Sequence, residues 1–450
     1  MKKISKICCL LTCLSLVSCG DVTISFIPTK GVTTLLKKSQ EPLNINYDHT
    51  KSENFKTFLD KFTNFSLKFN DSFLNTYDDK SSNVAISPLS LFFALAMTSE
   101  CTANNSQIEL LNALNMTTSE LRENIPILYG LENTTSYSYD AKKDEKILKS
   151  VKDLNNSLWF SNKVNKSINT LNNLANFYYV DSYETDFKNH NTQANKDLKA
   201  YVKDKTRGLI EPSFNLDIDT LLVLLNTFYV KDVWNEIGYD LSLTDTLYDF
   251  IGRNESINKT NLMMGNYVGG RAIHTDSYSS FFTKTQYGLK IHFLVPNESY
   301  KLDDVFNKEN INNILNLNNY EYSNHELKER YFTSTYFPSF EASCNEDLVD
   351  LLRENFKIYD MFNQYKADFT NISFDDEMYV SKVIHQTKLK VERKGIEGAA
   401  ITAVIFDEAA SGIADGYTSV YETFVVDKSF GYVITDKYGV MLFSGVVNNI

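Results

Sequence analysis

The sequence predicts an α+β fold in one large domain. Helical patterns come first along the chain, whereas strand-like segments dominate the last third, and this separation is typical of α+β domains. The 450 residues include 30 Phe and 27 Tyr, and 43% of all residues are hydrophobic, which is ample for a large core. Because no clean linker follows residue 55, we expect a single domain from residue 55 to residue 450.

Helices are predicted in the first half of this domain. Aromatic residues recur every three or four positions over 58–77, which is typical of one face of an amphipathic helix. Pro88 suits the first turn of a second helix that covers 91–97. Shorter helical patterns follow at 108–114, 171–179 and 192–205. The polar, charged stretch 130–150 is interpreted as a surface excursion.

Strands are predicted after these helices. Segment 220–230 is apolar, β-branched and aromatic, which indicates a buried strand. Later strand-like segments alternate with turns and cover 289–295, 331–340, 379–391, 423–434 and 440–447.

The N-terminus has the pattern of an export signal. Three lysines among the first six residues precede the apolar run 7–17, which is too short for a typical membrane-spanning helix. The run ends in Leu16-Val17-Ser18-Cys19-Gly20, which looks like a bacterial lipobox. We therefore expect a lipoprotein signal peptide at 1–18 and acyl chains on Cys19, where each buried CH2 contributes about 0.8 kcal/mol to anchoring. An ordinary secretory signal with a chance cysteine is the alternative.

Residues 19–54 are predicted to form a tether, because they mix Thr, Lys, Asn and Pro without a sustained period. Under either kind of signal the protein is exported, and with the lipid its body is held on the bacterial cell membrane outside the cytoplasm. Only Cys101 and Cys344 then remain as thiols. We expect both to be buried and free, with one disulfide between them as the alternative.

Composition and motifs exclude several classes of function. The formal net charge is −12 and Lys and Arg do not cluster, so we expect no nucleic-acid partner. The sequence lacks the His-Glu-x-x-His, Gly-x-Ser-x-Gly and P-loop patterns of common catalytic sites. Its six His do not pair with Cys or carboxylates at metal-ligand spacing. We therefore expect a protein that is not an enzyme and that has no metal site and no cofactor.

The segment Lys394-Gly-Ile-Glu-Gly-Ala-Ala-Ile-Thr-Ala403 carries the most specific functional signal. It contains no Pro, and after Glu397 it contains only small and β-branched residues. Such a segment can enter between two existing strands, because central strands exclude Pro and crowded neighbours favour small side chains. The pattern resembles the hinge of a serpin reactive loop. The matching hinge residues are Gly395, Ile396, Glu397, Gly398, Ala399, Ala400 and Thr402.

Further motifs resemble serpin motifs and follow the family order over residues 55–450. They lie at 83–90 (Asn-Val-Ala-Ile-Ser-Pro-Leu-Ser), 224–234, 337–340, 424–430 and 442–448. The resemblance implies the serpin fold, in which N-terminal helices pack on large, mostly antiparallel sheets and a reactive loop, here about 392–423, is exposed near the C-terminus.

The resemblance also implies roles for buried residues. Ser87, Ser90, Asn226 and His385 correspond to the shutter, a polar cluster beneath the point where the main sheet parts. Buried polar groups left unpaired cost about 1–3 kcal/mol each, so such a cluster must be mutually hydrogen-bonded. Trp234 corresponds to the breach, where the loop first enters the sheet. Without the motifs, His385 and Trp234 read as ordinary core residues.

The implied activity is suicide-substrate trapping of a serine protease by a monomer. The protease attacks the loop, forms a covalent acyl complex, and is distorted when the loop inserts as a strand. The usual register places the reactive bond at Ala409-Ala410. Because residues 395–427 contain no Lys or Arg, a trypsin-like target is excluded, and an elastase-, subtilisin- or chymotrypsin-like target is expected. A shifted register would offer Phe406 or Tyr417 to chymotrypsin-like pockets, or Asp407, Glu408 or Asp415 to acid-specific ones.

Four hinge positions depart from the family pattern, namely Arg393, Ile396, Gly398 and Ile401. A Gly within a strand costs roughly 0.5–1 kcal/mol, so Gly398 weakens the inserted form. If insertion is slowed until hydrolysis wins, the chain is a non-inhibitory surface lipoprotein with the serpin fold. It would then act as a protease substrate or as a ligand-binding module.

Overall fold

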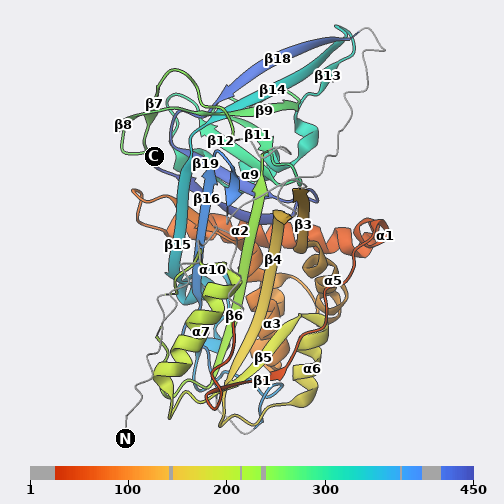
Figure 1. Ribbon diagram of the computed structural model, residues 1–450, viewed down its shortest axis with the longest axis vertical. Coiled ribbons are helices and arrows are strands. Elements are labelled where there is room, and N and C mark those ends of the chain that lie inside the picture. The colour runs from red at the N-terminus through yellow and green to blue at the C-terminus, as the bar shows by residue number, and fades with distance from the viewer. Residues whose placement is uncertain (1–25, 141–144, 213–214, 235–239, 375–377, 398–416) are drawn as a thin grey trace, which may run out of the picture.

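A computed structural model describes residues 26–450, apart from 141–144, 213–214, 235–239, 375–377 and 398–416 (Figure 1). A long central sheet runs vertically through the molecule. Most of the N-terminal helices lie behind this sheet, and α7 lies in front of its lower half. A smaller sheet forms the upper end. The α+β prediction is therefore confirmed.

Seven of the described helices lie within residues 47–205. They are α1 (Tyr47–Lys51), α2 (Glu53–Thr76), α3 (Pro88–Cys101), α4 (Asn104–Leu114), α5 (Thr118–Leu131), α6 (Ile168–Phe177) and α7 (Asn191–Lys205). Three short helices follow, namely α8 (Leu302–Val305), α9 (Lys308–Leu315) and α10 (Val349–Phe356).

The main sheet has 14 strands within the described residues, in the order β1-β5-β4-β6-β17-β16-β15-β2-β20-β19-β12-β11-β10, with β3 paired to β4. Its strands are β1 (Thr33–Lys37), β2 (Val84–Ile86), β3 (Asn133–Asp140), β4 (Glu145–Ser161), β5 (Val180–Thr185), β6 (Leu222–Val233), β10 (Ile273–His274), β11 (Tyr278–Lys284), β12 (Lys290–Pro296), β15 (Phe340–Asp347), β16 (Ile384–Glu392), β17 (Gly395–Glu397), β19 (Phe430–Thr435) and β20 (Met441–Val447). Most of these pairs are antiparallel, as predicted.

Two smaller sheets complete the fold. The upper sheet contains β9 (Met263–Gly269), β13 (Ser323–Asn324), β14 (Glu329–Phe337) and β18 (Thr418–Val425). A two-stranded ribbon contains β7 (Tyr248–Ile251) and β8 (Ile257–Thr260). In the part of the chain that the structure describes, no helix is long and apolar enough to cross a membrane.

The predicted aromatic helix is α2, and its sequence explains its position. The hydroxyl of Ser52 accepts a hydrogen bond from the Phe55 N–H and caps the first turn. Phe55, Phe58, Phe62, Phe65 and Phe69 are all buried against the core. Each such ring contributes roughly 1.5–3 kcal/mol by leaving water, so this face fixes α2 beneath the sheet.

Several local predictions are confirmed, and three are wrong. Helices form at 88–101, 104–114, 168–177 and 191–205, close to their predicted positions. The expected surface excursion 130–150 is instead the end of α5, then β3, then the start of β4. The segment 423–434 is divided between β18 and β19, and the strand predicted from Tyr379 begins only at Ile384. Strand β3 is polar, and it forms because β4 supplies its backbone partners, not because of an apolar pattern.

The predicted tether is wrong from residue 26 onwards, because this segment belongs to the folded body. Strand β1 pairs antiparallel with β5 at the edge of the main sheet. The Lys38 ammonium lies 2.8 Å from an Asp181 carboxylate oxygen, and the Ser39 N–H donates to the other oxygen at 2.8 Å. Cys101 and Cys344 are both buried and free. The predicted signal peptide and Cys19 lie outside the described residues.

The Phe26 side chain packs against three aromatic rings and holds this N-terminal segment on the folded body. Its ring lies 5.7 Å from Trp159 of β4, 6.0 Å from Tyr183 of β5 and 5.5 Å from Tyr201 of α7. The Thr29 hydroxyl then donates to the Asp197 carboxylate of α7 at 2.7 Å. The N-terminal segment therefore fills part of the core between the front of the sheet and α7.

Replacement of Phe26 by Ala should destabilise the protein by about 2 kcal/mol, because it opens a cavity in this aromatic cluster. The measurement is the denaturant midpoint of the first unfolding transition. Ile27→Ala is the matched control, since Ile27 is 82% exposed and should change the stability by less than about 0.5 kcal/mol. Equal effects of the two substitutions would show that the segment does not contribute to the core.

Candidate functional site

The first three predicted hinge residues already form a strand inside the main sheet. Strand β17 lies between β6 and β16, and it pairs antiparallel with both. Ile396 lies opposite Asp232 on one side and Val391 on the other. The side chain of Ile396 is completely buried. The start of the predicted hinge is therefore part of the main sheet.

This pairing corrects the predicted loop boundaries of 392–423. Residues 395–397 are in the main sheet, and 418–423 belong to β18 of the upper sheet. The remaining hinge residues and the predicted bond lie outside the described residues; these are Gly398, Ala399, Ala400, Thr402, Ala409 and Ala410.

Local contacts explain why the hinge turns into the sheet at this point. A Cβ atom at Gly395 would lie 2.2 Å from the carbonyl oxygen of Asp232, so only glycine permits this approach of the two strands. The Arg393 side chain donates to the Leu241 carbonyl at 3.0 Å, and the Leu241 N–H donates to the Arg393 carbonyl at 2.8 Å. Arg393 thus fixes the turn between β16 and β17.

The predicted breach residue Trp234 lies at the same end of the sheet. It is buried, and its indole N–H donates to the Glu392 carbonyl at 2.7 Å. Its ring contacts Phe337 of the upper sheet at 5.5 Å between centroids. Trp234 therefore connects the top of β16 to the upper sheet, next to the entry point of the hinge.

Three of the four predicted shutter residues lie together. The Ser87 N–H donates to His385 Nε2 at 3.1 Å, the Ser87 hydroxyl donates to the Leu442 carbonyl at 2.9 Å, and Ser87 Oγ accepts from the Ser90 N–H at 3.3 Å. Burial lowers the pKa of His385 to about 4, so the ring stays neutral and Nε2 can accept this bond at physiological pH.

Asn226, the fourth predicted shutter residue, pairs elsewhere. Its side-chain amide donates to the Asn156 side-chain oxygen on β4 at 2.7 Å. The Oδ1 atom of Asn226 is buried without a hydrogen-bond partner, and so is the neighbouring Thr227 hydroxyl. The predicted polar cluster is therefore divided between β6 and β16, the two strands that flank the hinge. On β6, the Asn226 side-chain oxygen can still accept a hydrogen bond.

The sequence interpretation missed Asp232, a buried carboxylate directly opposite the hinge. It accepts hydrogen bonds from the Thr285 hydroxyl at 2.6 Å and from the Tyr287 N–H at 3.2 Å. Burial nevertheless raises the pKa of Asp232 to about 7. The signal in the sequence was an acidic residue next to Lys231, at the end of a mostly apolar strand.

Among the described residues, no group of three or more His, Cys, Asp or Glu side chains could hold a metal ion. The arrangement is a short strand between β6 and β16, with polar side chains further along both neighbouring strands.

Comparisons with known proteins agree with this arrangement. A family model described as "Serpin (serine protease inhibitor)" matches residues 60–450. The chain belongs to the serpin family. Its family is thus one of protease inhibitors, and the predicted serpin fold is confirmed.

Individual relatives are distant but cover nearly the whole chain. Iripin-1 of Ixodes ricinus is 27% identical over 87% of this chain and 95% of its own length. An uncharacterized serpin-like protein of Methanosarcina acetivorans is 25% identical over 98% and 96%, respectively. Among solved structures, the thermophilic serpin Tengpin in its native state has a TM-score of 0.67 at 20% identity, covering 93% of this chain and 100% of that chain. Serpin48 of Tenebrio molitor has a TM-score of 0.68 at 17% identity, covering 89% and 100%.

The buried carboxylate of Asp232 predicts a pH-dependent stability. Its pKa is about 3.9 when unfolded and higher when folded, so the stability that Asp232 contributes is present below pH 4 and is lost as the pH rises through 7. Relative to Asp232→Asn, the wild-type unfolding free energy should fall by on the order of 1 kcal/mol per pH unit between pH 5 and 7.

The measurement is denaturant unfolding of both proteins from pH 5 to 8. Asp276→Asn serves as control, because Asp276 is exposed and its replacement should shift the whole curve equally. Parallel curves for wild type and Asp232→Asn would contradict the predicted titration of Asp232.

Proposed function

We propose that this serpin inhibits a serine protease by suicide-substrate trapping, with Ala409-Ala410 as the reactive bond. The observation that carries the proposal is the position of β17, which has already started a new strand between β6 and β16. A loop that begins in this register needs only to continue the same pairing to complete its insertion.

The register supports a specific insertion path. Continuing the observed pairs would place Gly398 opposite Val230 and Leu389. It would place Thr402 opposite both Asn226 and His385, the two halves of the divided polar cluster. The Thr402 hydroxyl could then satisfy the buried, unpartnered oxygen of Asn226.

The alternation of side chains fits the same path. Because Ile396 points into the core, every second residue after it would do so as well, namely Gly398, Ala400, Thr402, Val404 and Phe406. None of these is charged. The pairing would end with Phe406 opposite Leu222, the first residue of β6, so the bond at Ala409 would lie just beyond the strand.

The protease, and not this chain, supplies the groups that catalyse the cleavage. The serine hydroxyl of the protease attacks the Ala409 carbonyl carbon, the bond to the Ala410 nitrogen breaks, and that nitrogen takes the proton and leaves as a new amine. An ester then joins Ala409 to the protease. Insertion of residues 398–406 would move this ester by about 30 Å along the sheet before water can hydrolyse it.

The target class follows from the loop sequence. A small residue at Ala409 suits elastase- or subtilisin-like pockets, and the nearby aromatic residues suit chymotrypsin-like ones, whereas the absence of Lys and Arg from 395–427 excludes trypsin-like ones. The test mixes a chain that begins at Gly20 with each of these three proteases. Denaturing gels and mass spectrometry should show an SDS-resistant adduct and a released peptide that begins at Ala410.

Cleavage of the chain without an SDS-resistant adduct would overturn the proposed inhibitory function. If cleavage then raises the melting temperature strongly, the protein is a substrate-type serpin with an inserting loop. If cleavage leaves the melting temperature unchanged, the loop does not insert, and a ligand-binding surface protein fits better.

Insertion predicts a difference between neighbouring hinge residues. Thr402→Arg would bury a guanidinium beside His385, which costs several kcal/mol and should convert the inhibitor into a substrate, with at least a tenfold loss of adduct relative to cleaved chain. Ala403→Arg is the matched control, because its side chain would lie on the opposite face of the sheet from Thr402, beside half-buried Leu225 and exposed Ile384. Equal adduct yields from both variants would contradict the proposed register.

We further propose that the protein is exported as a monomer and is anchored to the bacterial cell membrane through lipid on Cys19. In a bacterial host, Cys19→Ser should abolish incorporation of labelled fatty acid and move the protein from the membrane fraction to the soluble one. Cys101→Ser, at a buried free thiol, should leave both unchanged. Continued labelling of Cys19→Ser would place the anchor elsewhere.

A further inference from the structure

A lysine and two carboxyl side chains are buried together where three elements of the fold meet. Lys152 lies on β4, Glu132 ends α5, and Asp436 begins the turn between β19 and β20. The Lys152 side-chain nitrogen Nζ lies 3.2 Å from Glu132 Oε1 and 3.5 Å from Asp436 Oδ2. The side chains of Lys152, Glu132 and Asp436 are 12%, 0% and 2% exposed, respectively. We refer to these three residues as the buried triad.

As a cluster of ions, the buried triad is poorly satisfied. Glu132 Oε2 and Asp436 Oδ2 are both buried without a hydrogen bond. Two carboxyl groups also share one ammonium group, although removing charges from water is costly unless each of them is fully paired. Burial raises the pKa of Glu132 to about 8, so this carboxyl group holds a proton at neutral pH. Burial lowers the pKa of Lys152, but the carboxyl groups of Glu132 and Asp436 outweigh this effect and raise it, so the lysine starts as an ammonium ion.

The two oxygens of the Asp436 carboxyl group have different surroundings. Oδ1 accepts hydrogen bonds from the Tyr438 N–H at 2.8 Å and from the Val440 N–H at 3.0 Å. Two backbone donors at this distance stabilise an oxygen on which negative charge develops, as in the oxyanion hole of an acyl-transfer enzyme. Oδ2 faces Lys152 instead and has no such donor. A nucleophile that attacks Asp436 Cγ would therefore find one oxygen stabilised and the other free to leave.

We propose that the buried triad is a self-modification site, at which Lys152 Nζ and Asp436 Cγ join in an amide bond while Glu132 acts as general acid. The reaction is a condensation that releases one water molecule, so it requires neither an oxidant nor a second substrate. Well-oriented groups within one molecule react with effective molarities on the order of 10⁵–10⁸ M. The inference does not depend on the proposed inhibitory function.

The atoms and charges balance in three steps. A proton first moves from the Lys152 ammonium group to Asp436 Oδ2, which leaves a neutral amine and a neutral carboxyl group in a site where burial favours uncharged forms. The amine nitrogen then attacks Cγ, and negative charge develops on Oδ1 beside its two N–H donors. Finally the Cγ–Oδ2 bond breaks. Oδ2 takes a proton from Glu132 and leaves as water, and Glu132 recovers a proton from the new amide nitrogen.

The amide bond would join the two parts of the chain that cleavage at Ala409-Ala410 separates. Lys152 precedes this predicted reactive bond in the sequence, and Asp436 follows it. Cleavage of a linked chain therefore leaves residues 410–450 attached through Lys152. A released peptide that begins at Ala410 comes only from chains in which the amide bond has not formed.

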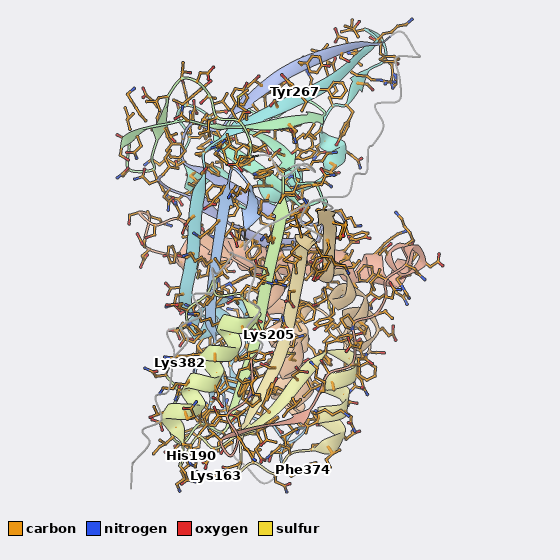
Figure 2. The ribbon with its side chains drawn as sticks, viewed as in Figure 1. Lys163, His190, Lys205, Tyr267, Phe374 and Lys382 are labelled. Carbon is orange, nitrogen blue, oxygen red and sulfur yellow. The ribbon has the colours of Figure 1, made fainter. Side chains whose placement is uncertain are left out.

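The test is mass spectrometry of the denatured wild-type protein, which requires no variant. The mass should be lower by one water molecule than the mass calculated from the sequence of the same chain. A tryptic digest should contain a linked peptide with both Lys152 and Asp436, because trypsin does not cleave after a lysine that has lost its charge. Lys163, Lys205 and Lys382, which Figure 2 labels in the lower half of the molecule, are internal controls and should be cleaved.

Two variants test the assigned roles, and thermal unfolding checks that they fold. Lys152→Arg keeps the positive charge but removes the nucleophile, so its mass should equal the calculated one. Glu132→Gln should lower the linked fraction by about tenfold or more, because a positioned general acid contributes about 10²–10⁴-fold to a rate. Lys38→Arg is the matched control. Lys38 lies 2.8 Å from Asp181, but its side chain is 63% exposed, so its replacement should leave the loss of water unchanged.

Three results would overturn the proposal or part of it. A wild-type mass equal to the calculated one, with cleavage after Lys152, would show that the buried triad is only a cluster of ions. A linked peptide that joins Lys152 to Glu132 would overturn Asp436 as the electrophile. Equal linkage in Glu132→Gln and in the wild type would overturn the role of Glu132 as general acid. None of these results changes the inhibitory function, which the SDS-resistant adduct tests separately.

Discussion

The pairing of β17 with both β6 and β16 is the interaction on which the rest of the structure depends. Among the described residues, β17 is the strand that joins the two halves of the main sheet, and it contributes only three residues. The first part of β6, Leu222 to Asn226, is only half-buried although the strand is central in the sheet order. On this strand the Asn226 side-chain oxygen and the Thr227 hydroxyl are buried without a hydrogen-bond partner. Under the proposed mechanism, the hinge would continue between β6 and β16, below Glu397.

Hydrogen bonds hold the strands on either side of β17 in place. Trp234 and Arg393 fasten its upper end through backbone carbonyls, and Ser87 holds His385 on one side while Asn156 holds Asn226 on the other. Burial of the Ile396 side chain in the core stabilises β17 in its position between the two strands. Asp232, directly opposite Ile396 in the register, is buried as well, and burial raises the pKa of its carboxyl to about 7.

The sequence predicted the features that depend on local periodicity and on ordered motifs, and it missed those that depend on distant partners. The phenylalanines of α2 predict this helix because they recur every three or four residues. Strands β1 and β3 carry little apolar pattern, and they become strands only because β5 and β4 offer them unpaired backbone. The hinge motif showed where a strand could enter, but not that residues 395–397 already pair with β6 and β16. The departure at Ile396 was the one sign of this, and the burial of its side chain depends on Asp232, which is remote in sequence.

The corrected N-terminal segment changes what lipid anchoring would do. Strand β1 lies at the lower end of the main sheet, whereas β18, which follows the reactive loop, lies at the upper end (Figure 1). Six residues lie between Cys19 and Phe26, and the seven steps from one to the other reach at most about 25 Å. An anchor at Cys19 would therefore hold the lower end close to the membrane and present the loop away from it. Insertion of the loop would then draw a captured protease towards the membrane, so the spacing between Cys19 and Phe26 limits the room available for the trapped complex.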